Sequence, residues 1–208
     1  MNVEDLKLYL VTNHDDNVER FLKTIENAIK GGVTIVQLRE KTGDSGELYN
    51  LALKVKEITD KYDIPLIIDD RIDIMLAVDC AGIHIGQSDM PCDVARKLVG
   101  NNKIIGVSAH NIEEALKAQE DGADYLGCGA VYPTLTKKNP NRVSKECLKQ
   151  ISDAVDIPVV AIGGIKIENA QELENTGIAG LCVVSAIMDS DNPKKVSEKL
   201  LEISKNIK

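Results

Sequence analysis

The sequence lacks tryptophan entirely and has one phenylalanine among its 208 residues. Proteins that bind single-stranded nucleic acid stack the bases on aromatic side chains, so this scarcity argues against such a partner. Acidic residues outnumber basic ones by 33 to 25, which gives a formal net charge of −8. A surface of that sign repels nucleic acid and anionic membranes. We therefore expect small-molecule ligands, and an anionic ligand would need a local cluster of basic residues.

Long apolar runs and paired cysteines are also missing. No stretch approaches the roughly 18 consecutive apolar residues of a membrane span, and the acidic N-terminus has no signal-peptide pattern. The cysteines are scattered without a close pair, at positions 80, 92, 128, 147 and 182. The sequence therefore predicts neither a zinc site nor a disulfide framework, and it favours a cytoplasmic protein with reduced thiols.

Short apolar segments alternate with amphipathic segments along the chain. The expected strands are 6–12, 33–38, 66–68, 83–85, 103–107, 124–127, 158–162 and 180–184. The expected helices are 18–30, 47–60, 71–78, 91–99, one from 111, 145–154, 167–175 and one from 192. No linker interrupts the alternation, so it predicts one domain over residues 1–208, a (β/α)8 TIM barrel. A doubly wound open sheet is the alternative, but the glycine fingerprint that it usually carries after its first strand is absent.

Polar residues concentrate after the predicted strands. In such a barrel the active site forms from the loops at the C-terminal ends of the strands. The candidate residues at those ends are Gln37, Arg39, Lys41, Asp69, Asp70, Gln87, Asp89, Ser108, His110, Thr134, Thr136, Lys137, Lys138, Gly163, Gly164 and Ser185. Basic residues, carboxylates and a glycine pair on one rim are the components of a magnesium–pyrophosphate site.

Asp70 and Asp89 follow neighbouring strands, so their carboxylates are placed to share one Mg²⁺. This ion commonly takes one or two carboxylates and completes its shell with water and substrate phosphate. The alternative is that each aspartate caps the following helix, which is the simpler interpretation of either residue alone. In the same way, Arg39, Lys41 and Lys137 are alternatively solvated loop charges.

Gly163 and Gly164 follow the seventh predicted strand, and Ser185 follows the eighth. Barrels commonly bind phosphate at these ends through backbone N–H groups, although a glycine pair also simply permits positive φ. His84 lies inside a predicted strand, where a histidine is usually a packing residue. His110 follows a strand end and is the candidate for proton transfer, with a residue preceding a helix cap as the alternative.

Seven motifs at predicted strand ends resemble, in order, those of the thiamin phosphate synthase family. They are Gln-Leu-Arg-Glu-Lys at 37–41, Asp-Asp-Arg at 69–71, Gly-Ile-His-Ile-Gly-Gln-Ser-Asp at 82–89, Gly-Val-Ser-Ala-His at 106–110, Pro-Thr-Leu-Thr-Lys-Lys at 133–138, Ala-Ile-Gly-Gly-Ile at 161–165 and Val-Val-Ser-Ala-Ile at 183–187. The resemblance implies a transferase that joins hydroxymethylpyrimidine pyrophosphate to a thiazole phosphate and releases pyrophosphate.

The resemblance also implies a role for each matching residue. Asp70 and Asp89 would hold the Mg²⁺ that bridges the departing pyrophosphate. The expected catalytic residues, which bind the same group, are Arg39, Lys41, Ser108 and Lys137. The residues expected to orient the pyrimidine ring are Gln37 and Asp69. The residues expected around the thiazole phosphate are Thr134, Thr136, Gly164, Val184 and Ser185.

The implied chemistry needs no general base for attack. An electron-rich aminopyrimidine expels pyrophosphate to leave a methylene cation, which the thiazole nitrogen captures with a lone pair that it already has. The protein then has to neutralise charge on the leaving group and hold two reactants close. A rim rich in basic residues and metal ligands suits this task.

Asp69 departs from the family, which usually carries asparagine at this position. An amide both donates and accepts hydrogen bonds, whereas an ionised carboxylate only accepts. Asp69 would therefore bind only the exocyclic amine, add a third oxygen facing the metal, or stay protonated beside Asp70.

Three other functions compete with this interpretation. A thiazole tautomerase would use His110 but has no need of Asp70, Asp89 or Lys137. A non-catalytic binder of thiamin precursors would keep the phosphate site after the seventh and eighth strands but would not need Arg39 and Lys41. A sugar-phosphate isomerase would need a general base that the rim does not offer. A homo-oligomer is compatible with each of these functions.

Overall fold

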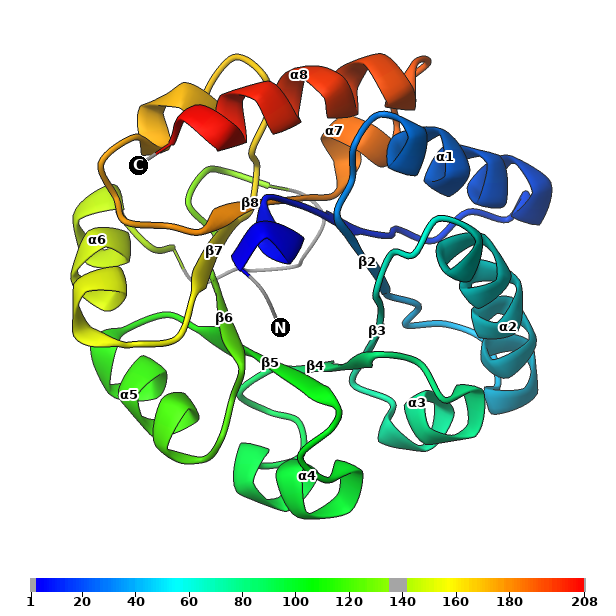
Figure 1. Cartoon of the computed structure of the whole chain (residues 1–208), viewed down its shortest axis with the longest axis horizontal. Helices are drawn as coiled ribbons and strands as arrows, with labels where there is room; N and C mark the ends of the chain where they lie inside the picture. Colours follow the sequence, from blue (N-terminus) through cyan, green and yellow to red (C-terminus); the bar gives the residue numbers. More distant parts are fainter. Residues whose placement is uncertain (1–2, 135–141, 208) are drawn as a thin grey trace.

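The computed structural model describes residues 3–134 and 142–207 of the chain, and it forms a closed barrel of eight parallel strands (Figure 1). The strands pair in sequence order, and β8 pairs with β1 to close the sheet. A ring of helices surrounds the strands (Figure 1). The predicted (β/α)8 barrel is therefore confirmed.

The strands are short and each is followed by a helix or a helical turn. The strands are β1 (Leu8–Val11), β2 (Ile35–Leu38), β3 (Leu66–Asp69), β4 (Gly82–Ile85), β5 (Ile104–Ala109), β6 (Tyr125–Cys128), β7 (Val159–Ile162) and β8 (Gly180–Val183). The helices are α1 (Val18–Lys30), α2 (Ser45–Lys61), α3 (Ile72–Val78), α4 (Cys92–Val99), α5 (Ile112–Glu120), α6 (Lys145–Ala154), α7 (Ser185–Met188) and α8 (Pro193–Asn206), with the 3-10 turns η1 (Val3–Leu6) and η2 (Ala170–Leu173).

Alternation along each strand divides the buried residues into two layers. On β3, Leu66 and Ile68 face the helices, whereas Ile67 faces the inside of the barrel. The larger apolar cluster fills the space between strands and helices, and the smaller one fills the barrel. Because successive side chains of a strand point to opposite faces, both faces of this sheet are buried and its strands read as continuous apolar runs.

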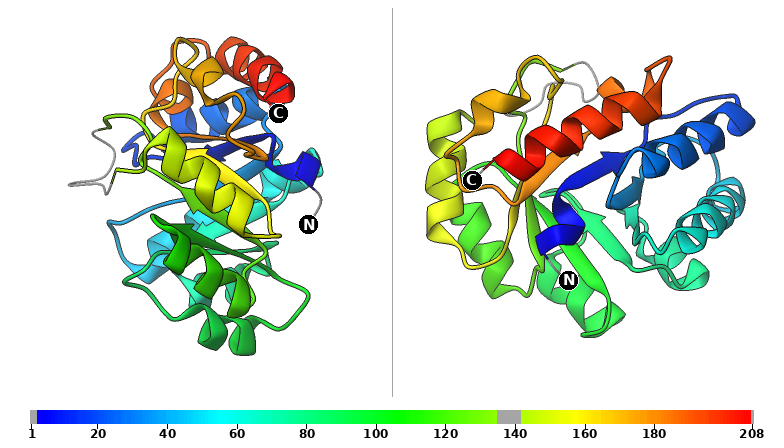
Figure 2. Two further views of the ribbon diagram at one scale, coloured as in Figure 1. Left: turned by 90° about the vertical axis from the view of Figure 1, so that its left-hand side faces the viewer. Right: turned by 45° about the horizontal axis from the view of Figure 1, so that its top comes forward.

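Side-chain caps fix several helix starts, including that of the helix predicted from residue 111. Asp44 and Glu47 form a capping box at the start of α2, and Asn111 accepts a hydrogen bond from the N–H of Glu114 at α5. The last helix, α8, packs along α1 (Figure 1). The turn η1 lies at the N-terminal ends of the strands, the end of the barrel away from the strand termini that carry the candidate residues (Figure 2).

The predicted helix over 167–175 is wrong, because only the turn η2 forms there. The Asn169 side chain accepts a hydrogen bond from the N–H of Lys166 and donates one to the carbonyl of Gly164. These bonds hold the segment in a loop until Ala170. The short helix α7 was not predicted. No helix in the described parts of the chain is long and apolar enough to span a membrane.

Candidate active site

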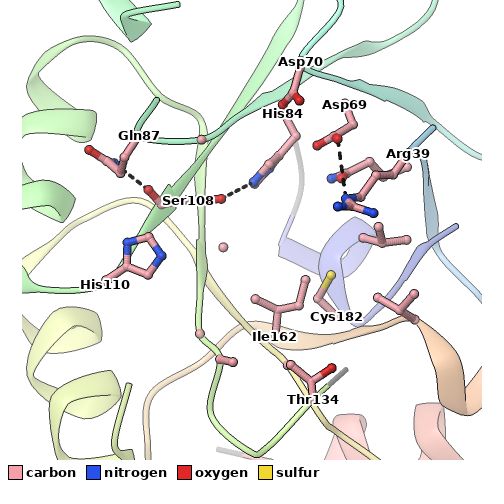
Figure 3. Close-up of a pocket in the computed structure, with 18 of the residues that line it drawn as sticks. Arg39, Asp69, Asp70, His84, Gln87, Ser108, His110, Thr134, Ile162 and Cys182 are labelled. Atoms are coloured by element: carbon pink, nitrogen blue, oxygen red, sulfur yellow. Dashed lines mark hydrogen bonds and ion pairs between the residues drawn. The ribbon is translucent and has the colours of Figure 1, made fainter. Parts of the chain in front are cut away.

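A pocket of about 550 Å³ opens at the C-terminal ends of the strands (Figure 3). The predicted site residues that line it are Gln37, Arg39, Lys41, Asp69, Asp70, Asp89, Ser108, Thr134, Gly164, Val184 and Ser185. They come from six of the eight strand ends and from the loop after β6. Thr136, Lys137 and Lys138 lie outside the described residues, and their places in the site stay predictions. The fold thus brings together the rest of the set.

Asp70 and Asp89 face each other in this pocket. Asp70 follows β3 directly with φ of 58°, and its N–H donates to the carbonyl of His84. Burial raises the pKa of Asp89, and a hydrogen bond with the Asp70 carboxylate raises it further. Two carboxylates in such contact need a shared proton or a cation between them.

The alternative role of these aspartates as helix caps is wrong. The residue that caps α3 is Arg71 and the residue that caps α4 is Pro91, each without a side-chain hydrogen bond. The Asp89 carboxylate instead accepts a hydrogen bond from the N–H of Gly86 at 2.7 Å, which turns it toward the pocket. Both carboxylates are therefore directed by loop geometry rather than by helix starts.

Two basic side chains lie against these carboxylates. The Nζ of Lys41 is 2.7 Å from Oδ2 of Asp69 and also contacts the Asp70 carboxylate, while Nε of Arg39 is 3.7 Å from the same Asp69 oxygen. Burial alone would lower the pKa of Lys41, but Asp69 and Asp70 outweigh it and raise that pKa. The pKa of Asp69 is raised because burial outweighs the effect of Lys41 and Arg39.

The oxygen ligands in this pocket suit a hard divalent cation whose remaining ligands are water or substrate oxygens. Asp70 and Asp89 supply two carboxylates. Among the described residues, no three Asp, Glu, His or Cys side chains converge as a metal site. A cation held here would complete its shell with water and a ligand's phosphate oxygens, as Mg²⁺ commonly does.

The glycine pair after β7 is required by its surroundings. Gly164 has φ of 66°, and a Cβ there would lie 2.5 Å from the carbonyl oxygen of Pro133. Only glycine accepts this conformation at such close packing without strain.

The start of α7 lies directly after β8. Val184 caps α7 without a side-chain hydrogen bond, and Ser185 is the first residue of that helix.

Two histidines line the pocket, and the structure gives them different surroundings. His84 points inward from β4 because Ile83 and Ile85 point outward, and its ring nitrogens lie 3.0 Å from the hydroxyls of Tyr125 and Ser108. It is hydrogen-bonded inside the barrel, as a packing histidine should be, but its place in the pocket was missed (Figure 3). The alternation of strand β4 is the signal that would have found it.

Comparison with known proteins decides the family. The family model described as thiamine monophosphate synthase matches residues 8–187. A thiamine-phosphate synthase of Methanobrevibacter smithii is 61% identical over 202 residues, covering 97% of each chain. One from Clostridium tetani is 55% identical and covers 94% of each chain. The solved thiamine phosphate pyrophosphorylase of Pyrococcus furiosus superimposes with a TM-score of 0.89 at 39% identity, covering 99% of this chain and 98% of that one.

The chain belongs to the thiamine monophosphate synthase family.

This family member is a transferase, and among the described residues that line its pocket no thiol is activated. Cys182 lines the pocket, but burial raises the pKa of its thiol far above neutral pH, so the thiol stays protonated and unreactive. His110 lies between β5 and α5 and contacts the first turn of α5, because its Nδ1 lies 2.8 Å from Oε2 of Glu114. What the described part of the pocket offers is the positive charge of Arg39 and Lys41 beside the carboxylates of Asp69 and Asp70.

Proposed function

We propose that the protein joins hydroxymethylpyrimidine pyrophosphate to a thiazole phosphate, forming thiamin phosphate and releasing pyrophosphate. The relatives at 61% and 55% identity carry the name of this synthase. The observation that carries the proposal is the cluster in which Asp70 faces Asp89 while Lys41 and Arg39 lie alongside. This is the arrangement that a departing diphosphate with a divalent cation requires.

Asp70 and Asp89 would hold Mg²⁺. When bound, the ion supplies positive charge that neutralises the diphosphate as it leaves. Arg39 and Lys41 bind the same diphosphate, and Ser108 donates a hydrogen bond to it. Lys137 belongs to this group by its motif.

The reaction is dissociative in this proposal. The aminopyrimidine expels the diphosphate, and the thiazole nitrogen captures the methylene cation that remains. Attack needs no general base, which agrees with the protonated Cys182 thiol and with the contact between His110 and Glu114. The protein contributes by holding the two reactants in line and by stabilising charge on the leaving group.

The second substrate occupies the other strand ends. Gly164, Val184 and Ser185 would bind the thiazole phosphate through backbone and hydroxyl groups, with Thr134 beside the ring. Thr136 joins this set by its motif.

Asp69 has a function of its own in this proposal. Its contact with Lys41 opposes the rise in its pKa that burial causes, and the Asp69 carboxylate aims the ammonium group at the diphosphate. The carboxylate then accepts a hydrogen bond from the exocyclic amine of the pyrimidine, where the family's usual asparagine would present an amide.

The direct test is formation of thiamin phosphate from the two purified substrates, with EDTA as the control. We expect product and pyrophosphate in equal amounts with Mg²⁺ and none after chelation. Interconversion of thiazole phosphate isomers without condensation would favour a tautomerase instead. Tight binding of either substrate without any turnover would favour a non-catalytic binder.

A further inference from the structure

Five side chains form a continuous hydrogen-bonded chain across the inside of the barrel. The amide Nε2 of Gln37 donates to the Tyr9 hydroxyl at 2.8 Å, and the Tyr9 and Tyr125 hydroxyls lie 2.6 Å apart. The Tyr125 hydroxyl lies 3.0 Å from Nδ1 of His84, whose Nε2 lies 3.0 Å from Oγ of Ser108. The chain thus begins at one pocket residue on β2 and ends at another on β5.

The two tyrosines that form its middle are sealed from water. Tyr9 is 1% exposed and Tyr125 is fully buried. Gly106 makes room for the Tyr125 ring, since a Cβ at that position would overlap it, and Gly127 lies against the ring of His84. A buried hydroxyl without a partner is costly, so each group must both donate and accept within this chain.

Such a chain has only two consistent directions of donation. In the first, Gln37 donates to Tyr9, Tyr9 to Tyr125, Tyr125 to Nδ1 of His84, and Nε2–H of His84 to Ser108. In the second, every donor and acceptor is exchanged, so the Ser108 hydroxyl donates to His84 and the Gln37 amide oxygen accepts from Tyr9. Each tyrosine has one hydroxyl hydrogen and each neutral imidazole has one N–H, which is why the links reverse together.

The two directions present different atoms to the pocket. In the first, the Ser108 hydroxyl hydrogen points away from His84 and is available to an anion, and the amide oxygen of Gln37 remains as an acceptor. In the second, Ser108 offers lone pairs to the pocket and Gln37 offers its NH₂ group. An anionic oxygen at Ser108 therefore selects the first direction, in which the amide Nε2 of Gln37 donates to Tyr9, as the structure has it.

We propose that Tyr9, Tyr125 and His84 are positioning residues that couple anion binding at Ser108 to the orientation of the Gln37 amide. A diphosphate at Ser108 fixes the Gln37 oxygen toward the pocket, and this oxygen selects a ring that carries an amino group over one that carries an oxygen there. The identity of the anion rests on the proposed function, whereas the coupling rests on the hydrogen-bonded chain itself.

The tautomer of His84 reports the direction of the chain without any turnover. We would label the three histidines with ¹⁵N and record their imidazole shifts with inorganic pyrophosphate and Mg²⁺. The expected result is a neutral His84 protonated at Nε2, with this preference weakened in Tyr125→Phe. A His84 protonated at Nδ1, or at both nitrogens, with pyrophosphate bound would overturn the proposal.

Steady-state kinetics give the second readout. In Tyr9→Phe and Tyr125→Phe, loss of one buried hydroxyl, and with it two links of the chain, should raise KM for the pyrimidine diphosphate about threefold to tenfold. The preference for the amino ring over its oxygen analogue should fall by a similar factor, and KM for the thiazole phosphate should not change. Tyr62→Phe is the matched control, because it removes a tyrosine hydroxyl that donates to Glu26 outside the barrel.

Each outcome separates the coupling from the proposed function. Equal changes in both KM values, or a fall in kcat alone, would assign the tyrosines a merely structural role and overturn the coupling. A wild-type protein that makes no product would refute the proposed function, while the His84 tautomer would still test the chain. If Tyr125→Phe does not fold, Tyr9→Phe and the wild-type spectrum carry the test.

Discussion

Replacing Lys41 with methionine removes one positive charge from the pocket while keeping an unbranched side chain of similar length. The ammonium group contacts Asp69 at 2.7 Å and also contacts Asp70. Loss of one donor that stabilises charge in a transition state usually slows a reaction by about 100- to 1000-fold. Because the Lys41 side chain is 45% exposed, solvent screening reduces its effect, and we expect kcat/KM for the pyrimidine diphosphate to fall about 10- to 100-fold.

The same substitution should cost some stability. It leaves the Asp69 carboxylate, whose side chain is 9% exposed, with Arg39 at 3.7 Å as its nearest basic partner among the described residues. Because the lysine side of this pair is exposed to solvent, we expect a contribution of about 1 kcal/mol, which corresponds to about 2–4 °C in Tm for a chain of this length. The loss of activity should therefore exceed what unfolding explains, because the protein stays folded at 25 °C.

The assay measures thiamin phosphate by chromatography over a range of each substrate, together with a thermal melt. Lys149→Met is the matched control, because Lys149 pairs with Asp153 on the outer surface of α6. We expect that control to keep wild-type kinetics. A Lys41→Met protein within about twofold of wild-type kcat/KM would refute the idea that this charge acts on the departing diphosphate.

Three further predictions test other parts of the molecule. Asp89→Asn should weaken the apparent affinity for Mg²⁺ about tenfold or more in a metal titration of turnover; unchanged affinity would remove Asp89 from the metal site. Gly164→Ala should lower Tm and raise KM for the thiazole phosphate but not for the pyrimidine diphosphate, since its Cβ would press on the Pro133 carbonyl. A KM for the thiazole phosphate equal to that of wild type would place this phosphate elsewhere. Hydrogen bonds from Lys61, and to a smaller extent from Tyr62, lower the pKa of Glu26 from 4.5 to about 2. The ionised Glu26 carboxylate therefore stabilises the fold above pH 4.5, and this contribution is lost as the pH falls toward 2. Glu26→Gln should thus melt lower than wild type at pH 7, and the two melting curves should converge near pH 2; a gap that persists there would contradict the ion pair.

The sequence was sufficient for the barrel because its strands are buried on both faces and several of its helices begin at side-chain caps. Each apolar run had to be a strand of a parallel sheet, and the polar residues after it had to share one rim. The loop around Asn169 could not be predicted in this way. Its side chain bonds to backbone groups of Lys166 and Gly164, a local competition that periodicity does not reveal.

Much of the pocket could likewise be predicted from strand ends, but its interior could not. Tyr125 and His84 belong to strands that are not neighbours in the sheet, and their contact depends on Gly106 making room between them. Such a meeting of side chains across a barrel follows from three-dimensional packing rather than from spacing along the chain. The contact of Lys41 with both Asp69 and Asp70 is of the same kind.

The left-handed backbone of Asp70 lets the end of β3 place two consecutive side chains in the pocket. An extended chain sends consecutive side chains to opposite sides, so β3 would normally contribute Asp69 to the pocket and turn the next residue toward the helices. A single residue with φ of 58° breaks this rule at the strand's end, and two adjacent carboxylates reach the same cavity. The end of β3 therefore contributes two carboxylates to the pocket instead of one, and no longer loop is needed.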